Sequence, residues 1–172
     1  MSRYALNKNK YLLDPELQRL NEILDSFADQ DPRNTLLIRM ALETGARAQE
    51  VLNLEAKDLN DIEESVLIRG LKSSNDREIP LRPKFYAQLK RHLPADGPIF
   101  GIGYQRLYQI WELYRPVHKK FHSLRHTFAI RLYKKTKDIR LVQVALGHRN
   151  ITNTMIYADY LYSQQELRKL IL

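Results

Sequence analysis

Apolar side chains recur every three or four positions along most of the chain, which is the spacing of helices with one buried face. The pattern first appears after Asp14-Pro15, an N-cap followed by a first-turn proline, and it runs from Leu17 to Phe27. A second stretch with this spacing begins at about Asn34 and ends at Gly45, since glycine is common at a helix C-terminus. The later segments with helical spacing are those from about Asn34 to Gly45, Arg47–Leu54, Pro83–Leu93, Tyr104–Tyr114, from Ser123 onward, Ile139–Leu146, Ile151–Tyr157 and Ser163–Leu170.

Two short segments, Ser65–Arg69 and Arg77–Leu81, interrupt the helical pattern. The residues of both segments favour β-strands, and the polar stretch from Lys72 to Asp76 lies between them. This arrangement predicts a hairpin with a long, mobile loop. We therefore expect an α+β fold that is mainly α, with a small antiparallel β-sheet or hairpin among the helices.

The length of 172 residues is enough for one domain with its own core. No repeat or Gly/Ser-rich linker divides the chain, so we expect a loose N-terminal tail over residues 1–10 and one domain over residues 11–172. The domain ends in a C-terminal tail of about residues 163–172.

Composition excludes several classes of protein. The chain has no cysteine, so disulfides, thiolate catalysis and cysteine-based zinc sites are ruled out. It has no run of about 18 apolar residues and no secretory signal pattern near the N-terminus, so we expect no membrane contact and a cytoplasmic protein.

Charge is divided unequally along the chain, whose formal net charge is +8. Residues 11–64 hold five basic and thirteen acidic side chains, whereas residues 65–172 hold twenty basic and seven acidic ones. Between Arg115 and Arg140, nine lysines and arginines stand against Asp138 alone. Such a concentration of positive charge attracts nucleic acid, although basic runs also occur as solvated helix faces, so charge leaves both interpretations open.

Several single residues have a functional and a plain interpretation. Arg47 could bind an anion or pair with Glu50 at the surface, and Lys72 could act from the hairpin loop or be a solvated lysine. His148 follows a glycine that ends a helix, where it could simply interact with the helix C-terminus. Tyr157 is one of ten tyrosines, and a lone tyrosine on a helix usually belongs to the core or its rim.

The segment HSLRHTF is more informative. If Ser123 caps a helix, His122 and Arg125 lie near its N-terminal end, where free N–H groups and the helix dipole favour a phosphate. His122 and His126 have the four-residue spacing of a zinc-binding helix, but the metalloprotease motif needs a glutamate where Ser123 stands. We therefore expect no zinc site.

Four motifs in the order TGxRxxE, a hairpin lysine, HxLRHTFA and LGHxxIxxTxxY resemble the catalytic domain of tyrosine recombinases, the phage integrase family. The nine-residue spacing from His148 to Tyr157 is the spacing of that family, and the resemblance covers roughly Leu12 to Tyr160. It implies a site-specific DNA recombinase or integrase that cleaves and rejoins DNA through a 3′-phosphotyrosyl intermediate, with strand exchange through a Holliday junction.

The resemblance also implies how the phosphate is bound. Arg47 and Arg125 would hold the two non-bridging oxygens, since a guanidinium binds such oxygens bidentately and keeps its charge. His148 would donate a further hydrogen bond to a non-bridging oxygen. Glu50 would orient an arginine or a histidine without touching the phosphate itself.

By the same resemblance, Tyr157 is the nucleophile and His122 its proton acceptor. Lys72, assigned by counting eight residues back from Pro80, would protonate the departing 5′-oxygen. This chemistry needs no metal, cofactor or ATP. The competing metal-dependent nuclease would need clustered carboxylates, and the acids here are spread along helices.

The implied partner is double-stranded DNA, on which a free monomer would assemble as a homo-tetramer, with accessory proteins that bend DNA. The tail Ser163–Leu172 would pack on its own domain or on a neighbouring protomer. The N-terminal core-binding domain usual in the family is not expected here, so the chain is either a fragment or a minimal recombinase from a mobile element or a fimbrial-type switch. Alternatives are a topoisomerase-like or resolvase-like enzyme and a DNA-binding regulator with a recombinase-like fold.

Overall fold

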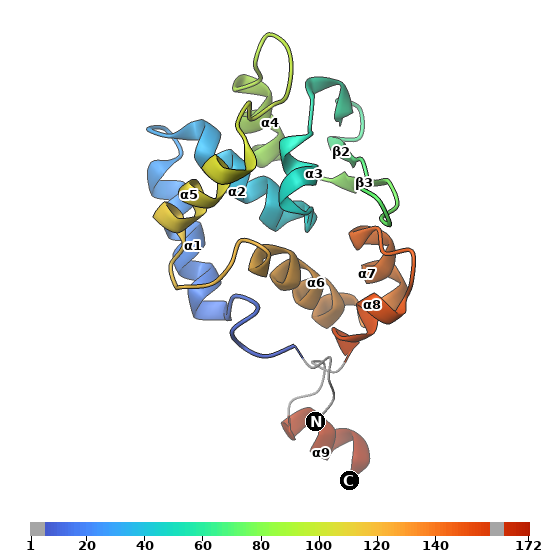
Figure 1. Cartoon of the computed structure of the whole chain (residues 1–172). Coiled ribbons are helices and arrows are strands. Elements are labelled where there is room, and N and C mark those ends of the chain that lie inside the picture. Colours follow the sequence, from blue (N-terminus) through green and yellow to red (C-terminus); the bar gives the residue numbers. More distant parts are fainter. Residues whose placement is uncertain (1–5, 159–163) are drawn as a thin grey trace.

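Helices make up most of the chain in the computed structural model, which describes residues 6–158 and 164–172. The mainly α fold with one small antiparallel sheet is therefore confirmed (Figure 1). The elements are α1 (Asp14–Phe27), α2 (Pro32–Thr44), α3 (Ala48–Leu52), the 3₁₀ turn η1 (Ala56–Asp58), β1 (Leu59–Asn60), β2 (Ser65–Ile68), β3 (Arg77–Pro80), α4 (Pro83–Arg91), α5 (Tyr104–Tyr114), α6 (Ser123–Thr136), α7 (Ile139–Leu146), α8 (Thr152–Met155) and α9 (Gln164–Ile171).

Local chemistry explains where the helices begin and end. At the start of α1, the Glu16 carboxylate accepts a hydrogen bond of 2.8 Å from the backbone N–H of Leu13. Gly45 and Gly147 end α2 and α7 in the left-handed region, with φ of 65° and 69°. A side chain at Gly147 would also collide with the backbone, since a Cβ there would lie 2.5 Å from the carbonyl oxygen of Asn75.

The sheet has the order β1-β2-β3, and both pairs are antiparallel. The strand β1 was not predicted, because two residues are too few to carry an alternating pattern. The loop between β2 and β3 contacts the end of α7 through Ser74 and Asn75, whereas its tip at Lys72 is exposed, and its mobility stays a prediction. The Asn75 N–H donates to the Gly147 carbonyl at 2.8 Å, and Ser74 pairs with His148 in an isolated bridge. These two residues thereby join the hairpin to the end of α7.

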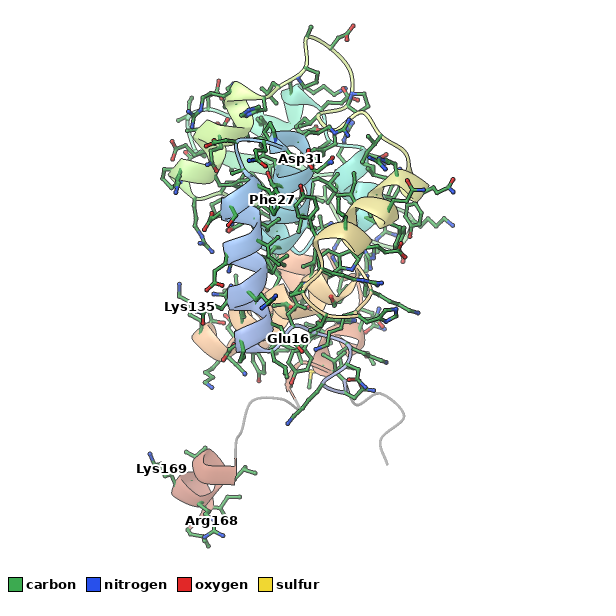
Figure 2. All side chains as sticks on the ribbon, turned by 90° about the vertical axis from the view of Figure 1, so that its left-hand side faces the viewer. Glu16, Phe27, Asp31, Lys135, Arg168 and Lys169 are labelled. Carbon is green, nitrogen blue, oxygen red and sulfur yellow. The ribbon has the colours of Figure 1, made fainter. Side chains whose placement is uncertain are left out.

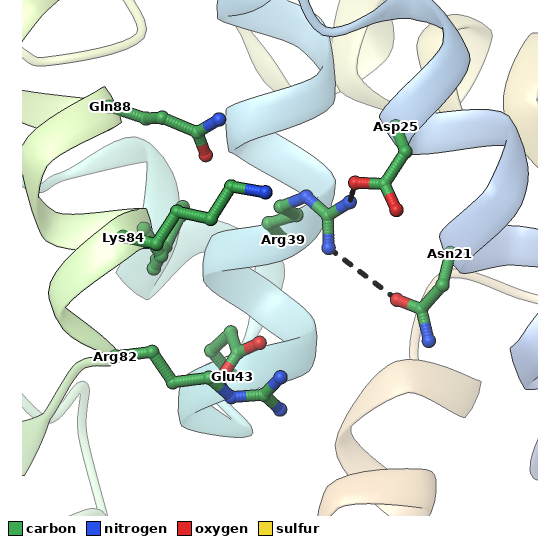
Figure 3. Close-up of a pocket in the computed structure, with 8 residues that line it drawn as sticks. Asn21, Asp25, Arg39, Glu43, Arg82, Lys84 and Gln88 are labelled. Atoms are coloured by element: carbon green, nitrogen blue, oxygen red, sulfur yellow. Dashed lines mark hydrogen bonds and ion pairs between the residues drawn. The ribbon is translucent and has the colours of Figure 1, made fainter.

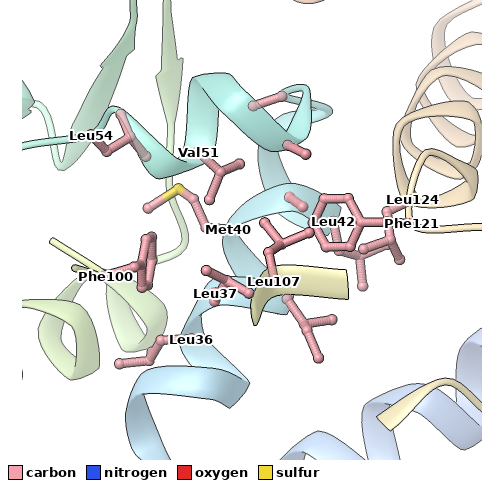
Figure 4. Close-up of a cluster of buried hydrophobic side chains, with 14 of the residues drawn as sticks. Leu36, Leu37, Met40, Leu42, Val51, Leu54, Phe100, Leu107, Phe121 and Leu124 are labelled. Atoms are coloured by element: carbon pink, nitrogen blue, oxygen red, sulfur yellow. The ribbon is translucent and has the colours of Figure 1, made fainter. Parts of the chain in front are cut away.

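Two groups of buried apolar side chains form the core. The larger one surrounds α2, and Figure 4 shows its members from α2, α3, α5 and the segment before α6. The smaller one, called here the second cluster, consists of Leu6, Tyr11, Ala129, Ile130, Tyr133, Val142, Leu146 and Tyr157. Figure 1 shows α6 below α2 and α3, with α7 and α8 beside it on the right. One predicted core position differs: Phe27 is 44% exposed and contacts Tyr114 edge to face.

The described part of the N-terminal tail is not loose, contrary to our prediction for residues 1–10. Residues 1–5 lie outside the described residues, but Leu6 is buried in the second cluster. The Lys119 ammonium donates to the carbonyl oxygens of Lys8 and Tyr11 at 2.9 and 2.7 Å and pairs with Glu16 at 2.5 Å. This buried lysine therefore ties residues 8–16 to the segment between α5 and α6.

The last helix, α9, lies apart from the other elements in both whole-chain views (Figure 1, Figure 2). It follows residues 159–163, which lie outside the described part, as does Ser163 of the predicted last helix. Its end leaves apolar side chains in solvent: Leu170, Ile171 and Leu172 are 69%, 74% and 97% exposed. None of the described helices is both long and apolar enough to cross a membrane.

Candidate active site

Arg125 lies on α6, is 2% exposed and is held by backbone carbonyls from two other elements. Its guanidinium donates to the carbonyl oxygens of Gly45 and Leu146 at 2.7 and 2.9 Å. Burial, followed by the positive charges of Arg47 and Arg77, lowers the pKa of Arg125 to about 9. A buried guanidinium whose charge is opposed by neighbouring arginines is poised to bind an anion.

His148 completes the surroundings of Arg125. Its Nε2 lies 3.0 Å from an Arg125 nitrogen, and its Nδ1 lies 2.8 Å from the Thr154 hydroxyl. Because arginine only donates, Nε2 accepts, and Nδ1 then carries the ring proton. Burial and the nearby arginines, Arg125 first, lower the pKa of His148 to about 4, so this ring is neutral at pH 7.

Arg47 precedes α3 and is half-buried. Its guanidinium contacts the hydroxyl of Ser74, and it lies 3.5 Å from a Glu50 carboxylate oxygen. Its backbone N–H donates to the other Glu50 oxygen at 2.8 Å. The contact with Ser74 connects Arg47 to the β2–β3 loop, two residues from Lys72.

Glu50 is 1% exposed and pairs with Arg77, a residue that was not predicted to belong to the site. The two Arg77 nitrogens donate to the two Glu50 oxygens at 2.9 and 2.7 Å, and the Arg77 Nε donates to the Ala145 carbonyl at 3.2 Å. Burial works to raise the pKa of Glu50, but the hydrogen bond and charge of Arg77 outweigh it, so the pKa is lowered. Glu50 therefore carries a negative charge between two arginines.

Tyr157 is 2% exposed and belongs to the second cluster. Its hydroxyl oxygen lies 2.8 Å from Nδ1 of His126. Burial raises the pKa of Tyr157 to about 12, even though the charges of Arg125 and Arg47 act in the opposite direction. The tyrosine is therefore a neutral phenol in contact with His126, whose sequence position had suggested only a zinc ligand.

His122 stands at the start of α6, and its ring meets that of His126 edge to face, with the centroids 4.7 Å apart. Burial, followed by the charges of Arg125 and Arg47, lowers the pKa of His122 to about 4. No hydrogen bond joins His122 to Tyr157 among the described residues.

The capping role expected of Ser123 was wrong. His122 is the N-cap and makes no side-chain cap bond, and the Ser123 hydroxyl has no hydrogen-bond partner among the described residues. The amides of Ser123 and Leu124 donate to the carbonyls of Lys120 and Phe121, at 2.9 and 3.0 Å. These two amides are therefore already hydrogen-bonded and are not free to bind a phosphate.

Lys72 differs from the other candidates, since it is exposed in the β2–β3 loop with a positive φ of 51°. The remaining six lie in one region, connected through the contacts described above: Arg47, Glu50, His122, Arg125, His148 and Tyr157.

Beside this region is a cavity of about 430 Å³, lined by His122, Ser123 and His126 on one side. Its other lining residues are mainly basic: Asn9, Lys10, Arg115, His118, Lys119 and Lys120. In the described parts of the chain, no group of three histidine or carboxylate side chains could hold a metal ion. Metal-independent chemistry remains a prediction.

Another cavity, of about 230 Å³, lies between α1, α2 and α4 (Figure 3). It is crossed by ion pairs between Arg39 and Asp25 at 2.5 Å and between Arg82 and Glu43 at 3.2 Å. It contains none of the candidate residues, and its charges largely neutralise one another.

The fold is that of the catalytic domains of tyrosine recombinases. The chain superposes on the catalytic domain of bacteriophage HP1 integrase with a TM-score of 0.68 and 25% identity, over 94% of both chains. It superposes on the XerH site-specific recombinase, in a post-cleavage complex with a palindromic difH substrate, with a TM-score of 0.74 and 26% identity, over 95% of this chain and 53% of XerH.

Sequence comparison then gives the family. The chain belongs to the phage integrase family, whose sequence pattern matches residues 10–97 and 104–164. It is 27% identical over 164 residues to the tyrosine recombinase XerA of Pyrococcus horikoshii, covering 86% of this chain and 56% of XerA. The chain thus spans about half the length of XerA and XerH, and the resemblance to tyrosine recombinases is confirmed.

Proposed function

We propose that this chain is the catalytic domain of a tyrosine-type site-specific recombinase or integrase. It cleaves and rejoins double-stranded DNA through a 3′-phosphotyrosyl bond to Tyr157, and strands are exchanged through a Holliday junction. The observation that carries the proposal is the buried Arg125, held by the carbonyls of Gly45 and Leu146 in the region that contains Arg47 and the phenol of Tyr157.

The phosphate-binding step falls to Arg47, Arg125 and His148. Burial, followed by the charge of Arg47, lowers the pKa of Arg125 in the free protein, and a bound phosphate would offset the repulsion between the two guanidinium groups. His148 accepts from Arg125 when no phosphate is bound, so donation to a phosphate oxygen requires this contact to be exchanged. Glu50 supports the site through the backbone of Arg47 and through Arg77.

The chemical step is an attack by the Tyr157 oxygen on phosphorus. The bond from phosphorus to the 5′-oxygen breaks as the bond to tyrosine forms, so the phosphodiester energy is retained for rejoining without ATP. Lys72, on the loop beside Ser74, would give the departing 5′-oxygen its proton. His122 is the proton acceptor that the family resemblance assigns. No metal or other cofactor enters the proposed reaction, since the arginines supply the charge that stabilises the transition state.

The proposed assembly is a homo-tetramer on DNA, formed from free monomers and assisted by proteins that bend DNA. The exposed apolar residues at the end of α9, Leu170 to Leu172, are suited to bind a neighbouring protomer. Deletion of residues 164–172 should then abolish DNA-dependent assembly, as measured by light scattering. Unchanged assembly would show that α9 is not the connecting element. The proposed location is the cytoplasm, in association with DNA.

A topoisomerase-like or resolvase-like enzyme would use the same chemistry, and a DNA-binding regulator would use none. The relatives favour recombination, because XerH is described as a site-specific recombinase bound to its substrate after cleavage.

The test is covalent trapping on a nicked duplex, from which the short cleaved fragment diffuses away so that rejoining fails. The probe is a pool of such duplexes with a randomised segment beside the nick, incubated in excess chelator. The wild-type chain should form an adduct that survives denaturation, and Tyr157→Phe should form none. Tyr104→Phe is the matched control, because Tyr104 is exposed on α5 and should leave trapping unchanged. Equal trapping by Tyr157→Phe, or a strict need for a divalent metal, would overturn the proposal.

A further inference from the structure

The cavity of about 430 Å³ beside the reacting groups is lined, among the described residues, by basic side chains and by no carboxylate. Three of its cations are Lys10, which precedes α1, and Arg115 and Lys120, which lie between α5 and α6. None of these three side chains has a hydrogen bond or an ion pair within residues 6–158 and 164–172. Unpaired positive charges that share one cavity repel one another, so an anion between them would be attracted.

A further lysine of the cavity, Lys119, holds its walls together. Its ammonium donates to the carbonyl oxygens of Lys8 and Tyr11, and it forms an ion pair with Glu16. The charge of Lys119 is therefore already neutralised, in contrast to the three unpaired cations. Because these contacts join the segment before α1 to the segment before α6, both sides of the cavity are in place in the free protein.

The α6 side of the cavity contains a buried hydroxyl without a partner. Ser123, in the first turn of α6, lines the cavity and is 2% exposed. Its hydroxyl makes no hydrogen bond to any of the described residues. Such a group is rare in folded proteins, because it has lost its bonds to water without gaining others. An anion bound against this turn would give the hydroxyl an acceptor.

The cavity adjoins the arginine site, because His122 and His126 line it and Arg125 stands between them in the same helix. Burial lowers the pKa of His126 first, and the charges of Arg125 and Lys10 lower it further. One ring thus lies within electrostatic reach of both the arginine site and the cavity. Since a DNA strand carries a phosphate about every 3.4 Å of helix axis, a strand whose scissile phosphate lies on Arg125 places its next phosphates close by.

We propose that the cavity bordered by Lys10, Arg115 and Lys120 binds a second phosphate of the cleaved strand, adjacent to the scissile one. This inference rests on the proposed function and adds a binding site to it. The cations neutralise the second phosphate, and the Ser123 hydroxyl donates to one of its oxygens. The volume of the cavity lies in the ordinary range for sites of small molecules, so it suits a sugar-phosphate unit better than a lone inorganic ion.

The role of this second site is to position the strand. Contacts with phosphates fix the register and the orientation of a protein on DNA without reading its sequence. A phosphate held only at Arg47 and Arg125 leaves the strand free to turn about that point, whereas a second contact sets the direction of the backbone at the scissile bond. None of the three unpaired cations takes part in the chemical step, so they are positioning residues.

The first test needs no cleavage. The full chain with both Arg115→Gln and Lys120→Gln, called here the cavity variant, is bound to a labelled random-sequence duplex at several salt concentrations. Its affinity at low salt should fall about 10-fold, and the slope of log affinity against log salt should become less steep by about 0.9 for the lost phosphate contact. The matched control combines Lys84→Gln and Arg91→Gln, which remove the same charge from exposed positions on α4 and should keep the wild-type slope. A wild-type slope for the cavity variant would overturn the inference.

The second test locates the phosphate. A duplex recovered from the trapped pool is synthesised with one uncharged methylphosphonate, placed in turn at each phosphate near the scissile one on the cleaved strand. At one of the two adjacent positions the wild-type chain should bind about 10-fold more weakly, whereas the cavity variant should lose nothing further, as expected for two changes that remove one contact. Equal sensitivity of both chains at every position, or no sensitive adjacent position, would overturn the inference. Displacement of AMP from the cavity with no sensitive position would assign the cavity to a free nucleotide and would also overturn it.

Ser123→Ala tests the buried hydroxyl. DNA binding should weaken about threefold while the free energy of unfolding does not fall, because the hydroxyl that is removed is unpaired in the free protein. The loss of affinity should vanish on the duplex with the sensitive phosphate replaced, and an equal loss on both duplexes would contradict the proposed contact. Failure of the wild-type chain to form any adduct would contradict the proposed function, whereas the salt dependence in the first test would still decide whether the cavity binds a phosphate.

Discussion

The arginine side of the site and its tyrosine side are held by different parts of the molecule. Arg125 is fixed by carbonyls at the ends of α2 and α7, and Arg47 is tied to the Glu50–Arg77 pair, which joins α3 to β3 and α7. Tyr157, by contrast, follows α8, a helix of only four residues, and packs in the second cluster.

In the proposed mechanism, this difference separates phosphate binding from the reaction of Tyr157. The arginine side is in place without DNA, because its charges are already oriented by buried hydrogen bonds. The tyrosine side keeps Tyr157 as a neutral phenol in the smaller of the two apolar clusters. In the proposed mechanism the phosphate site is therefore preformed, and control of cleavage lies with Tyr157 and the residues around it.

The largest expected effect concerns the pair that supports the arginine side. Glu50→Gln leaves the buried charge of Arg77 without a carboxylate, which should lower the free energy of unfolding by about 3–5 kcal/mol. Urea denaturation measures this change. Glu55→Gln is the matched control, because the exposed ion pair of Glu55 with Lys57 is screened by water and its loss should hardly move the midpoint. Equal midpoints for both variants would mean that the buried pair does not stabilise the site.

The next effect is on cleavage itself. Arg125→Lys keeps a positive charge but cannot contact Gly45, Leu146 and a phosphate together, so cleavage should slow by about 10²–10³-fold. Single-turnover trapping measures the rate, and Arg131→Lys on the exposed side of α6 serves as the control. A rate for Arg125→Lys near that of the control would argue against a preformed arginine site.

Stability should also depend on pH in a direction set by the neutral histidines. The pKa values of His126 and His148 are about 3 and 4 in the folded chain, below the ordinary value of 6.5, so the unfolded chain binds protons first as the pH falls. The free energy of unfolding should thus decrease between pH 7.5 and pH 5, by at most about 1.4 kcal/mol per pH unit for each histidine. Urea unfolding of His126→Asn should show a shallower decrease, and an identical slope would contradict this account.

The smallest effect distinguishes the two apolar clusters. Ile38→Val in the main core and Ile130→Val in the second cluster each remove one buried methylene and should each cost about 0.5–1.5 kcal/mol. Hydrogen exchange should show faster opening of α7 and α8 in Ile130→Val but not in Ile38→Val. Uniform loss of protection in both variants would mean that the second cluster does not open independently.

The fold followed from the sequence wherever local pattern decided it. The helices α5 and α7 have the predicted bounds, because apolar spacing and terminal residues such as Asp138 and Gly147 define them without help from distant residues. Arg47 and Glu50 could be placed together for the same reason, since they are three positions apart, which is less than one helical turn.

The missed contacts join residues far apart in the chain. Arg77 pairs with Glu50 across 27 positions, and His126 meets Tyr157 across 31, so both depend on how β3, α6 and α8 pack together. The sequence did contain one signal for Arg77. It is two positions from the apolar Ile79, and alternate residues of a strand point to the same face, which is the buried face of β3. The Ser123 cap failed because the preceding turn already satisfies the first amides of α6.

The most direct measurement locates the covalent bond. After trapping on the nicked duplex, the adduct is digested with protease and nuclease and the modified peptide is sequenced by mass spectrometry. The account predicts a nucleotide attached through its 3′-phosphate to the oxygen of Tyr157. Attachment to a different side chain, or through a 5′-phosphate, would contradict it.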